Sequence, residues 1–436
     1  MHGNFESATL IIQAELTSGQ QLSMASEFRI DKTRLLKDLE AFTSLGRIEG
    51  KEGMYRMAFT SEEELSRRWL IDSAEKAGLA CREDGARNIF VRLGSWDESA
   101  VATGSHIDSV PAGGHLDGAL GVIAGFECLR RLKELNIDLR CPVELIAFTD
   151  EEGRYGSMLG SRAICGKHTR DELVEAVNVD GERLDTALAR FDRSVDSVLS
   201  ASRSSSDYKA FVELHIEQGP VLDKGNHQIG VVTDIVGLFR WRAVLIGEAN
   251  HAGTTPMNVR KDAFAGLVEF ASNIENILDT LGSEHSRATI GKVENIPGAM
   301  GVVPAETHFS MDVRDPCSST LKSIQSALEE KLNMVAKKRG LDARVETVGE
   351  LEPVKCDERL QFAIERASNN LQLESLKLPS GAAHDAQTMA SLTDVAMIFI
   401  PSSQGLSHSP FEHSHDRDIE NGTNVLLNTL AQLVSS

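Results

Sequence analysis

The chain has 436 residues, of which 41% are hydrophobic and 25% are charged, and its formal net charge is -20 at pH 7. This composition excludes collagen-like, coiled-coil and largely disordered proteins, and the length is typical of two domains. A strongly acidic chain repels phosphate backbones and anionic lipids, so neither nucleic acids nor membranes are expected as partners.

Residues 1–27 are predicted to form an extension before the folded part of the chain. They have neither a basic start nor a long apolar stretch, so no signal peptide is expected. The six cysteines are scattered without a Cys-x-x-Cys pair, which argues against a cysteine-based metal site. Scattered thiols in a chain without a signal peptide are typical of a reducing compartment, so we expect a cytoplasmic location.

Strands and helices alternate in the first half of the chain. The hydrophobic pattern predicts a buried strand at 100–103, a helix at 119–135 and a strand at 143–148. A further strand at 210–216 alternates, so its successive side chains face opposite sides of a sheet. Strands separated by helices are typical of an α/β fold with a mainly parallel sheet.

The order of elements changes from about residue 228. The pattern then predicts paired strands, a helix, two strands, a helix and a strand, at 229–236, 238–246, 260–281, 288–293, 306–313, 320–338 and 343–348. This order suits a small α+β sandwich. A helix, a strand and a final helix follow at 358–370, 395–400 and 424–433.

The simplest architecture is therefore an α/β domain interrupted by an insertion. We expect a catalytic, metal-binding α/β domain at 28–227 and 350–436. We expect the α+β sandwich to form a separate domain inserted at 228–349.

Four polar clusters follow predicted strands, where open α/β folds gather their functional groups. They are GSHIDSVPAGGHLDGALG with His106, Asp108 and Asp117, FTDEEGRYGSMLGS with Asp150, Glu151 and Glu152, VELHIEQGP with His215 and Gln218, and QGLSHSPFEHSHD with His408, His413 and His415. Each cluster also has a simpler interpretation when taken alone. In the first, Asp117 would cap a helix, and the second would be a solvated acidic turn. In the third, His215 would be a histidine in the core or at the sheet edge, and the fourth would be a loop that binds metal adventitiously. Together, their histidines and carboxylates would satisfy a two-metal site with a bridging carboxylate, its ions roughly 3.5–4 Å apart.

Three further stretches carry polar side chains suited to substrate binding. GEANHAGTTPMNVRKDA offers His251, MDVRDP offers Arg314, and SGAAHDAQ offers His384. An arginine suits bidentate recognition of a carboxylate. The structural alternatives are a hairpin loop, a surface ion pair and a helix N-terminus.

From about residue 31 to its C-terminus, the sequence resembles the metal-dependent amidohydrolases of the peptidase M20 superfamily, specifically the hydantoinase/carbamoylase branch. That branch includes N-carbamoyl-L-amino acid hydrolases and allantoate amidohydrolases. The resemblance rests on long, nearly uninterrupted stretches: GSHIDSVPAGGHLDGALGV, TDEEGRYGSMLGS, ELHIEQGPVL and HAGTTPMNVRKDA.

The resemblance implies two divalent metal ions per subunit, with zinc expected first and manganese, cobalt or nickel as alternatives. His106 and His215 would bind one ion, Glu152 and His408 the other, and Asp117 would bridge both. Glu151 would be the general base and Asp108 would orient His106.

The resemblance also implies a homodimer that forms through the inserted domain. In it, His251 would reach the active site of the partner subunit and polarise the scissile carbonyl. Gln218, Arg314 and His384 would contact the substrate, with Arg314 on its carboxylate.

The sequence departs from the family pattern near the expected substrate carboxylate. Members usually carry Asn-x-x-Asn-Val-x-Pro-Gly before the arginine strand, whereas this chain has GAMGVVPA, with Gly298 and Gly301 in place of the asparagines. Ala383 likewise replaces a glycine of the pocket motif. The missing amide at Gly301 weakens the usual carboxylate clamp and leaves space for a bulkier substrate.

These observations favour an enzyme that hydrolyses a linear C–N amide or ureido bond of an N-carbamoyl L-amino acid or a related small carboxylate. An N-acyl amino acid amidase, for example a hydrolase of indoleacetyl-aspartate-type conjugates, is the nearest alternative because of Gly301. A general aminopeptidase is disfavoured by the branch-specific stretches. A catalytically inactive binding or scaffold protein on the same fold is the alternative of another class, but such a protein should have lost metal ligands.

Overall fold

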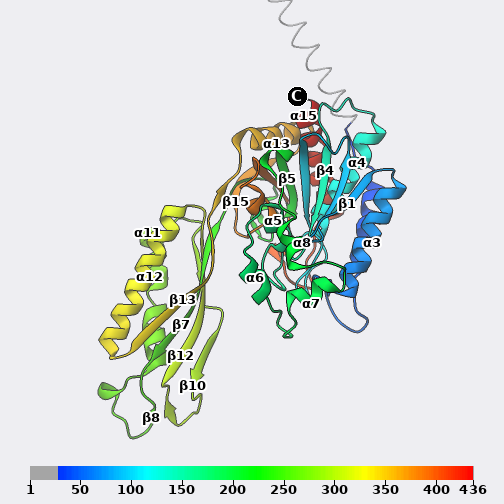
Figure 1. Cartoon of the computed structure of the whole chain (residues 1–436). Coiled ribbons are helices and arrows are strands. Elements are labelled where there is room, and N and C mark those ends of the chain that lie inside the picture. The colour runs from blue at the N-terminus through cyan, green and yellow to red at the C-terminus, as the bar shows by residue number, and fades with distance from the viewer. Residues whose placement is uncertain (1–27, 436) are drawn as a thin grey trace, which may run out of the picture. The chain divides into compact units, whose positions relative to one another are not determined.

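The computed structural model describes residues 28–435, and the predicted extension at 1–27 lies outside them. The chain divides into two compact units (Figure 1). Of the described residues, the first comprises 28–233, Cys356–Leu378 and 384–435, and the second comprises Asp234–Lys355 and Pro379–Ala383. Across the described residues, no helix combines the length and the apolarity needed to span a membrane.

The first unit is built on a large sheet with the strand order β1-β2-β4-β3-β5-β16-β6, and β15 also pairs with β6. The strands are β1 Ala80–Glu83, β2 Ile89–Leu93, β3 Ala100–His106, β4 Val143–Phe148, β5 Tyr208–Ile216, β6 Ile229–Ile235, β15 Ser375–Ser380 and β16 Val395–Ile400. The central neighbours β4, β3, β5 and β16 are parallel, whereas β1, β2 and β6 pair antiparallel. The predicted α/β fold with a mainly parallel central sheet is thus confirmed.

Helices cover both faces of this sheet. The helices of the first unit are α2 Lys32–Ser44, α3 Ser61–Lys76, α4 Ala119–Glu134, α5 Leu159–Ile164, α6 Arg170–Glu175, α7 Leu184–Ala189, α8 Val195–Leu199, α9 Val221–Gly225, α13 Glu358–Asn370, α14 Asp385–Met389 and α15 Asp416–Ser435. Apolar side chains of α2, α4, α13 and α15 share a core with alternate residues of β5, among them Val212 and Leu214. Glu213 points to the other face, where its carboxylate accepts a hydrogen bond from the first turn of α14. Because both faces are covered, β3, β4 and β16 are buried throughout.

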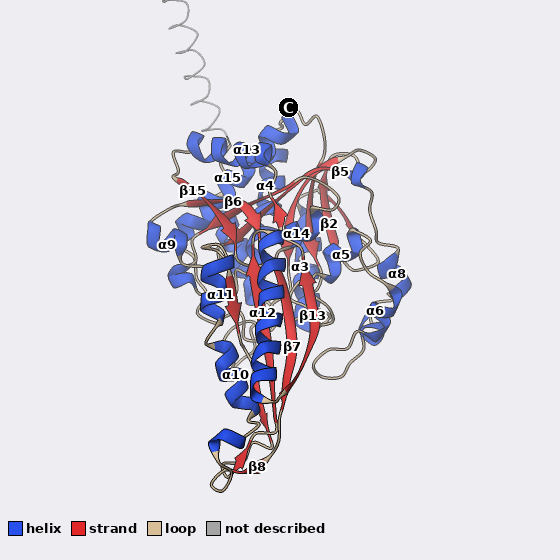
Figure 2. Cartoon of the chain, turned by 90° about the vertical axis from the view of Figure 1, so that its left-hand side faces the viewer, coloured by secondary structure: helices blue, strands red, loops and turns tan. Residues whose placement is uncertain are grey.

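The second unit is a five-stranded antiparallel sheet covered on one face by helices (Figure 2). Its elements are β7 Gly237–Ile246, β9 Arg287–Thr289, β10 Val293–Ile296, β12 Glu306–Asp315, β13 Asp342–Leu351, α10 Ala263–Ala271, α11 Ile274–Leu281 and α12 Ser318–Arg339. Alternate residues of β12 are buried, as a sheet with one covered face requires. A short ribbon of β8 Asn250–His251 and β11 Val302–Val303 lies beyond the end of this sheet.

Four element predictions are wrong in detail. The single strand predicted at 288–293 is two strands, β9 and β10, with residues 290–292 between them. The strands expected to pair at 229–236 and 238–246 belong to different sheets, because β6 pairs with β16 and β7 pairs with β12 and β13. The helix predicted at 260–281 is broken at Asn273, whose side-chain amide donates to the Glu269 carbonyl. The last helix begins at Asp416 rather than at residue 424, because its first turns are polar and give no apolar period.

Candidate metal centre

The candidate ligands gather where neighbouring parallel strands end. His106 is the last residue of β3, Glu152 follows β4, His215 is the penultimate residue of β5, and His408 lies in the loop after β16. Parallel strands end at the same edge of a sheet, which is where functional groups collect in this type of fold. The structure therefore brings together side chains that are far apart in the sequence.

Asp117 lies at the centre of this cluster and is 4% exposed. Its Oδ1 lies 3.4 Å from Nε2 of His106 and 3.1 Å from Nε2 of His215. Its Oδ2 lies 3.2 Å from Nε2 of His408, which in turn lies 3.4 Å from Oε1 of Glu152. The two oxygens of one carboxylate thus face two different groups of ligand atoms.

The donor set fits divalent transition metals. One group offers His106, Asp117 and His215, and a second offers Asp117, Glu152 and His408, with the ligand atoms of each group within 4.8 Å of one another. Imidazole nitrogens and carboxylate oxygens in such sets bind zinc and its neighbours in the first transition row. Asp117 belongs to both groups.

Asp117 does not cap the helix that follows it. The residue before α4 is Gly118, with φ 64°, and no side chain caps this helix end. A Cβ at Gly118 would come within 2.4 Å of the His106 ring, so only glycine allows the chain to turn here. The simpler reading of Asp117 as a helix cap is therefore wrong.

Backbone carbonyls orient two of the histidine rings. Nδ1 of His106 lies 3.0 Å from the carbonyl oxygen of Asp108, and Nδ1 of His215 lies 2.9 Å from that of Ile216. When Nδ1 donates its hydrogen to a carbonyl, Nε2 keeps a free lone pair directed at Asp117, which is the form that binds a metal.

The carboxylate of Asp108 is directed at the acidic turn rather than at the His106 ring. Its Oδ1 lies 3.9 Å from Nδ1 of His106, too far for a hydrogen bond. The carboxylate instead accepts the backbone N–H groups of Glu151 at 3.2 Å and Glu152 at 3.1 Å. Asp108 therefore orients His106 through its main chain and positions the acidic turn through its side chain.

The three adjacent acids of that turn have separate environments. Asp150 has a left-handed backbone, with φ 54°, and its buried carboxylate accepts the backbone N–H groups of Arg154 and Tyr155. Glu152 faces His408, whereas Oε2 of Glu151 lies 3.9 Å from Nε2 of His106. Asp150 thus folds the turn, while Glu151 and Glu152 point to the cluster.

Burial and mutual repulsion shape the electrostatics of this cluster. Burial raises the pKa of Glu151 well above its usual value, and the charges of Asp385, Glu152 and Asp108 add to the effect. Burial alone would lower the pKa of His106, but its hydrogen bond to Asp117 and the nearby carboxylates raise it well above normal. Buried Glu213 and Asp385 add two more carboxyl groups close by, and burial raises the pKa of each. Divalent cations would relieve this repulsion.

Gln218 and His384, both expected to contact substrate, adjoin the cluster. The side-chain amide of Gln218 donates to Oδ2 of Asp117 at 2.9 Å and to Oγ of Ser407 at 3.2 Å. His384 is 3% exposed, and its ring lies 4.6 Å from that of His215. Of the three histidines in the loop after β16, His408 belongs to a group of candidate ligands. The rings of His413 and His415 contact each other.

The remaining predicted site residues belong to the second unit. His251 is exposed on β8, where it pairs with Val302, and the adjacent Gly301 carbonyl accepts the N–H of Ala252. Arg314 is near the far end of β12, where it binds Asp312 at 2.7 Å and the carbonyl of Gly381 at 2.8 Å. At about 3.3 Å per residue, the part of β12 from Glu306 to Arg314 spans roughly 26 Å. His251 and Gly301 therefore lie at the opposite end of this unit from Arg314. Figure 1 shows β8 at one tip of the unit.

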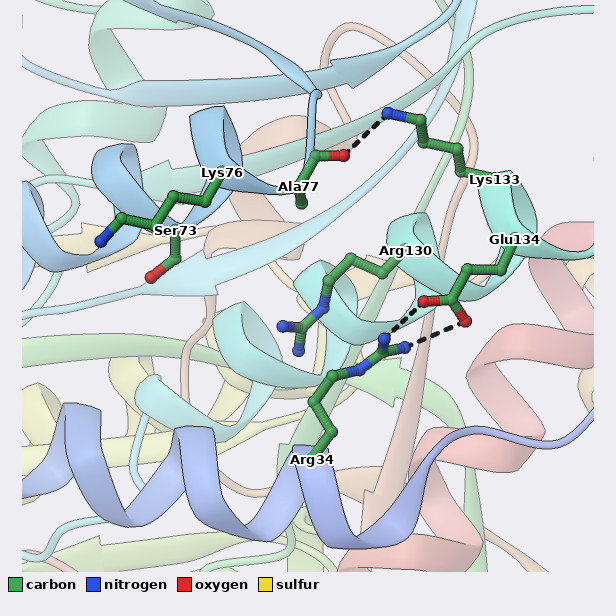
Figure 3. Close-up of a pocket in the computed structure, with 7 residues that line it drawn as sticks. All are labelled: Arg34, Ser73, Lys76, Ala77, Arg130, Lys133 and Glu134. Atoms are coloured by element: carbon green, nitrogen blue, oxygen red, sulfur yellow. Dashed lines mark hydrogen bonds and ion pairs between the residues drawn. The ribbon is translucent and has the colours of Figure 1, made fainter.

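A separate surface pocket lies between α2, α3 and α4 (Figure 3). Most of its cations already have partners: Arg34 pairs with Glu127 and Glu134, and Lys133 donates to the carbonyls of Ala77 and Gly78. These ion pairs and hydrogen bonds therefore connect the three helices. None of the candidate metal ligands lines this pocket.

Residues 102–432 match the model of Peptidase family M20/M25/M40. The chain belongs to this family. It is thus a hydrolytic enzyme that acts on amide bonds, and its family is metal-dependent.

Similar proteins extend the match to almost the whole chain. The N-carbamoyl-L-amino-acid amidohydrolase of Paenarthrobacter aurescens is 36% identical over 94% of this chain and 99% of its own length. The ureidoglycolate hydrolase of Arabidopsis thaliana is 33% identical over 94% of this chain and 88% of its own length. The crystal structure of a hydantoinase/carbamoylase family amidase from Burkholderia multivorans is 31% identical, with a TM-score of 0.85 over 94% of this chain and 99% of that one.

Proposed function

We propose that this protein hydrolyses the ureido C–N bond of an N-carbamoyl L-amino acid or a close ureido analogue, with two divalent metal ions per subunit. The observation that carries the proposal is the position of Asp117, whose two carboxylate oxygens face separate groups of nitrogen and oxygen ligands. We assign His106 and His215 to one ion, Glu152 and His408 to the other, and Asp117 to both.

The residues of the cluster have distinct parts in this reaction. Bound divalent ions would polarise the carbonyl and make water nucleophilic near neutral pH. Glu151 takes a proton from the attacking water and delivers it to the leaving nitrogen, a role that suits a buried carboxyl group with a raised pKa. Asp108 holds the acidic turn by its hydrogen bonds to the N–H groups of Glu151 and Glu152.

The names of the relatives support a ureido substrate. One acts on N-carbamoyl-L-amino acids and another on ureidoglycolate, and both substrates combine a ureido group with a carboxylate. We propose that Arg314 binds that carboxylate, because a guanidinium can form two parallel hydrogen bonds to it. Gln218 and His384 line the pocket in this proposal.

The length of β12 supports a homodimer with shared active sites. His251 and Gly301 lie roughly 26 Å or more from Arg314 along this strand, so one small substrate cannot touch both ends of the same unit. We propose that each site combines Arg314 of one chain with a loop from the other, so that His251 polarises the carbonyl bound in the partner subunit.

The named relatives do not favour the alternative of an N-acyl amino acid amidase, and Gly301 is the position that tests it. No atom lies within 4 Å of a Cβ built at Gly301, so the position is open. We expect Gly301→Asn to shift the ratio of kcat/KM values toward small carbamoyl substrates. An unchanged ratio would mean that Gly301 does not select the substrate.

The proposal is tested by a substrate panel of N-carbamoyl-L-amino acids, allantoate, ureidoglycolate and N-acyl-L-amino acids. Chelated enzyme is reloaded separately with zinc, manganese, cobalt or nickel, and ammonia and free amino acid are measured. We expect each turnover to consume one N-carbamoyl-L-amino acid and one water, and to release one amino acid, one ammonia and one carbon dioxide. Turnover of acyl substrates alone, or full activity without metal by elemental analysis, would contradict the proposal.

A further inference from the structure

Glu412 is a buried carboxylate that contacts two loops of the candidate metal centre. It is 2% exposed, and its Oε1 accepts the backbone N–H groups of Leu116 at 2.8 Å and Asp117 at 3.0 Å. Its Oε2 accepts the hydroxyl of Ser407 at 2.9 Å. Burying a carboxylate is costly unless hydrogen bonds replace water, and both oxygens of Glu412 are provided with them.

The neighbouring chain is shaped to admit this side chain. A Cβ built at Gly114 would lie 2.0 Å from the carboxyl carbon of Glu412, so even alanine would displace the carboxylate. Glu412 therefore occupies a space that the glycine leaves open. It ties the loop that carries Asp117 to the loop that carries His408.

Ser407 links Glu412 to the side chain of Asp117. Its Oγ lies 2.9 Å from Oε2 of Glu412 and 3.3 Å from Oδ2 of Asp117. A hydroxyl has one hydrogen to donate, and the nearer acceptor is Glu412. The amide of Gln218 donates to both Ser407 Oγ and Asp117 Oδ2, which leaves Ser407 as an acceptor from that side.

We propose that Glu412 is a positioning residue that prepares Asp117 to bridge two ions. Its Oε1 fixes the main chain of Asp117, and its Oε2 draws the Ser407 hydrogen away from Oδ2, so that this oxygen keeps its lone pairs for a metal. This inference rests on the proposed function, because it takes Asp117 to be a metal ligand.

The test compares metal affinities of ion-free variants by competition with a chelator and by titration calorimetry with Zn²⁺. Glu412→Gln keeps an acceptor for the two backbone N–H groups, but its amide donates to Ser407 and turns the hydroxyl hydrogen toward Asp117. We expect the affinity for Zn²⁺ to fall roughly tenfold or more, the scale found for groups that orient metal ligands. Adding Ser407→Ala removes that hydrogen and should restore most of the affinity.

Asp84 provides a matched control. One of its oxygens accepts the backbone N–H groups of Ala86 and Asn88, the other accepts a side-chain amide, and neither touches a candidate ligand. We expect Asp84→Asn to lower the unfolding temperature without changing Zn²⁺ affinity. A merely structural role for Glu412 would give the same result in Glu412→Gln.

A second variant reaches the same contact without altering the glutamate. Gly114→Ala should displace the Glu412 carboxylate and lower Zn²⁺ affinity in the same direction. Wild-type affinity in either Glu412→Gln or Gly114→Ala would overturn the inference, and failure of Ser407→Ala to rescue would overturn its account of the hydroxyl hydrogen. Absence of Zn²⁺ binding by the wild-type chain would instead refute the proposed function.

Discussion

At the scale of single residues, Glu151 and Glu152 are neighbours in sequence with different surroundings. Glu152 faces His408, whereas Glu151 faces His106, and burial raises the pKa of Glu151 in the ion-free protein, which makes its carboxylate a stronger base. One position therefore suits metal binding and the other suits proton transfer.

We expect Glu151→Gln to keep the metal and lose activity. The amide is nearly isosteric but cannot accept a proton, and a general base contributes roughly 10²–10⁴-fold. Elemental analysis and kcat should therefore separate Glu151→Gln, which retains its ions, from the matched Glu152→Gln, which loses affinity for one. A loss of kcat smaller than about tenfold in Glu151→Gln would assign the base to another residue.

His408 gives the centre a predictable pH dependence. Its hydrogen bonds to Asp117 and then Glu152 raise its pKa to about 10 in the ion-free protein. A metal binds the neutral ring, so an incoming ion must displace a proton. We expect affinity for divalent ions to increase as the pH rises toward 10, with proton release measured by calorimetry in buffers of different ionisation enthalpy.

The sign of the stability effect follows from the same shift. Because the folded pKa of His408 lies above the usual histidine value of 6.5, its ion pairs stabilise the ion-free fold fully below about pH 6.5. That stabilisation is lost as the pH rises through about 10. His408→Asn should reduce the proton release, whereas His413→Asn, in the same loop, should not; equal release from both variants would exclude His408 as the source.

At the scale of elements, β12 presents Arg314 beside an acidic partner. Arg314 and Arg240 both bind Asp312, at 2.7 and 2.8 Å, but Arg240 is on the adjacent strand β7 and half of its side chain is exposed. The two arginines therefore form a natural pair of test and control.

We expect Arg314→Ala to lower kcat/KM severely and Arg240→Ala to change it little. A hydrogen bond to a charged group contributes about 1.5–3 kcal/mol, which corresponds to a loss of roughly 10- to 150-fold. The effect should be largest for substrates with a free carboxylate and vanish for their amides. Equal losses in both variants would show that Asp312, rather than the substrate, is the important partner.

Elements also show what the sequence could and could not predict. The strand at 143–148 and the helix at 358–370 agree with β4 and α13, because each has a clear apolar period and distinct ends. The sheets to which β6 and β7 belong could not be predicted, since both strands are apolar and their pairing depends on distant strands.

Among the site residues, Asp117 could be predicted from its motif. The contact of Asp108 with His106 could not, because it is made by a backbone carbonyl, which no residue type encodes. Glu412 gave one faint signal, an acid between His408 and His413 of a histidine-rich loop.

At the scale of the whole molecule, the proposed active site needs two chains. Mixing inactive His251→Ala and inactive Glu151→Gln subunits should restore part of the activity, because one hybrid site would hold both intact groups. Activity is measured after subunit exchange has been demonstrated with labelled chains. Mixing Glu151→Gln with Glu152→Gln is the control without rescue, since both defects fall in the same unit. Absence of rescue in the first mixture would place His251 in its own chain's site or outside catalysis.

The candidate ligands are spread along most of the chain, and this spacing affects the stability of the folded protein. All six cysteines are free, so no covalent bond closes any loop of the fold. The candidate ligands run from His106 to His408, and an ion held between them would act as a non-covalent staple across most of the polypeptide. In a chain cut at an exposed loop, a bound ion would add to the sheet and core contacts that hold the fragments together, and a chelator would remove that added stabilisation. Metal supply would in this way govern the lifetime of the protein as well as its chemistry.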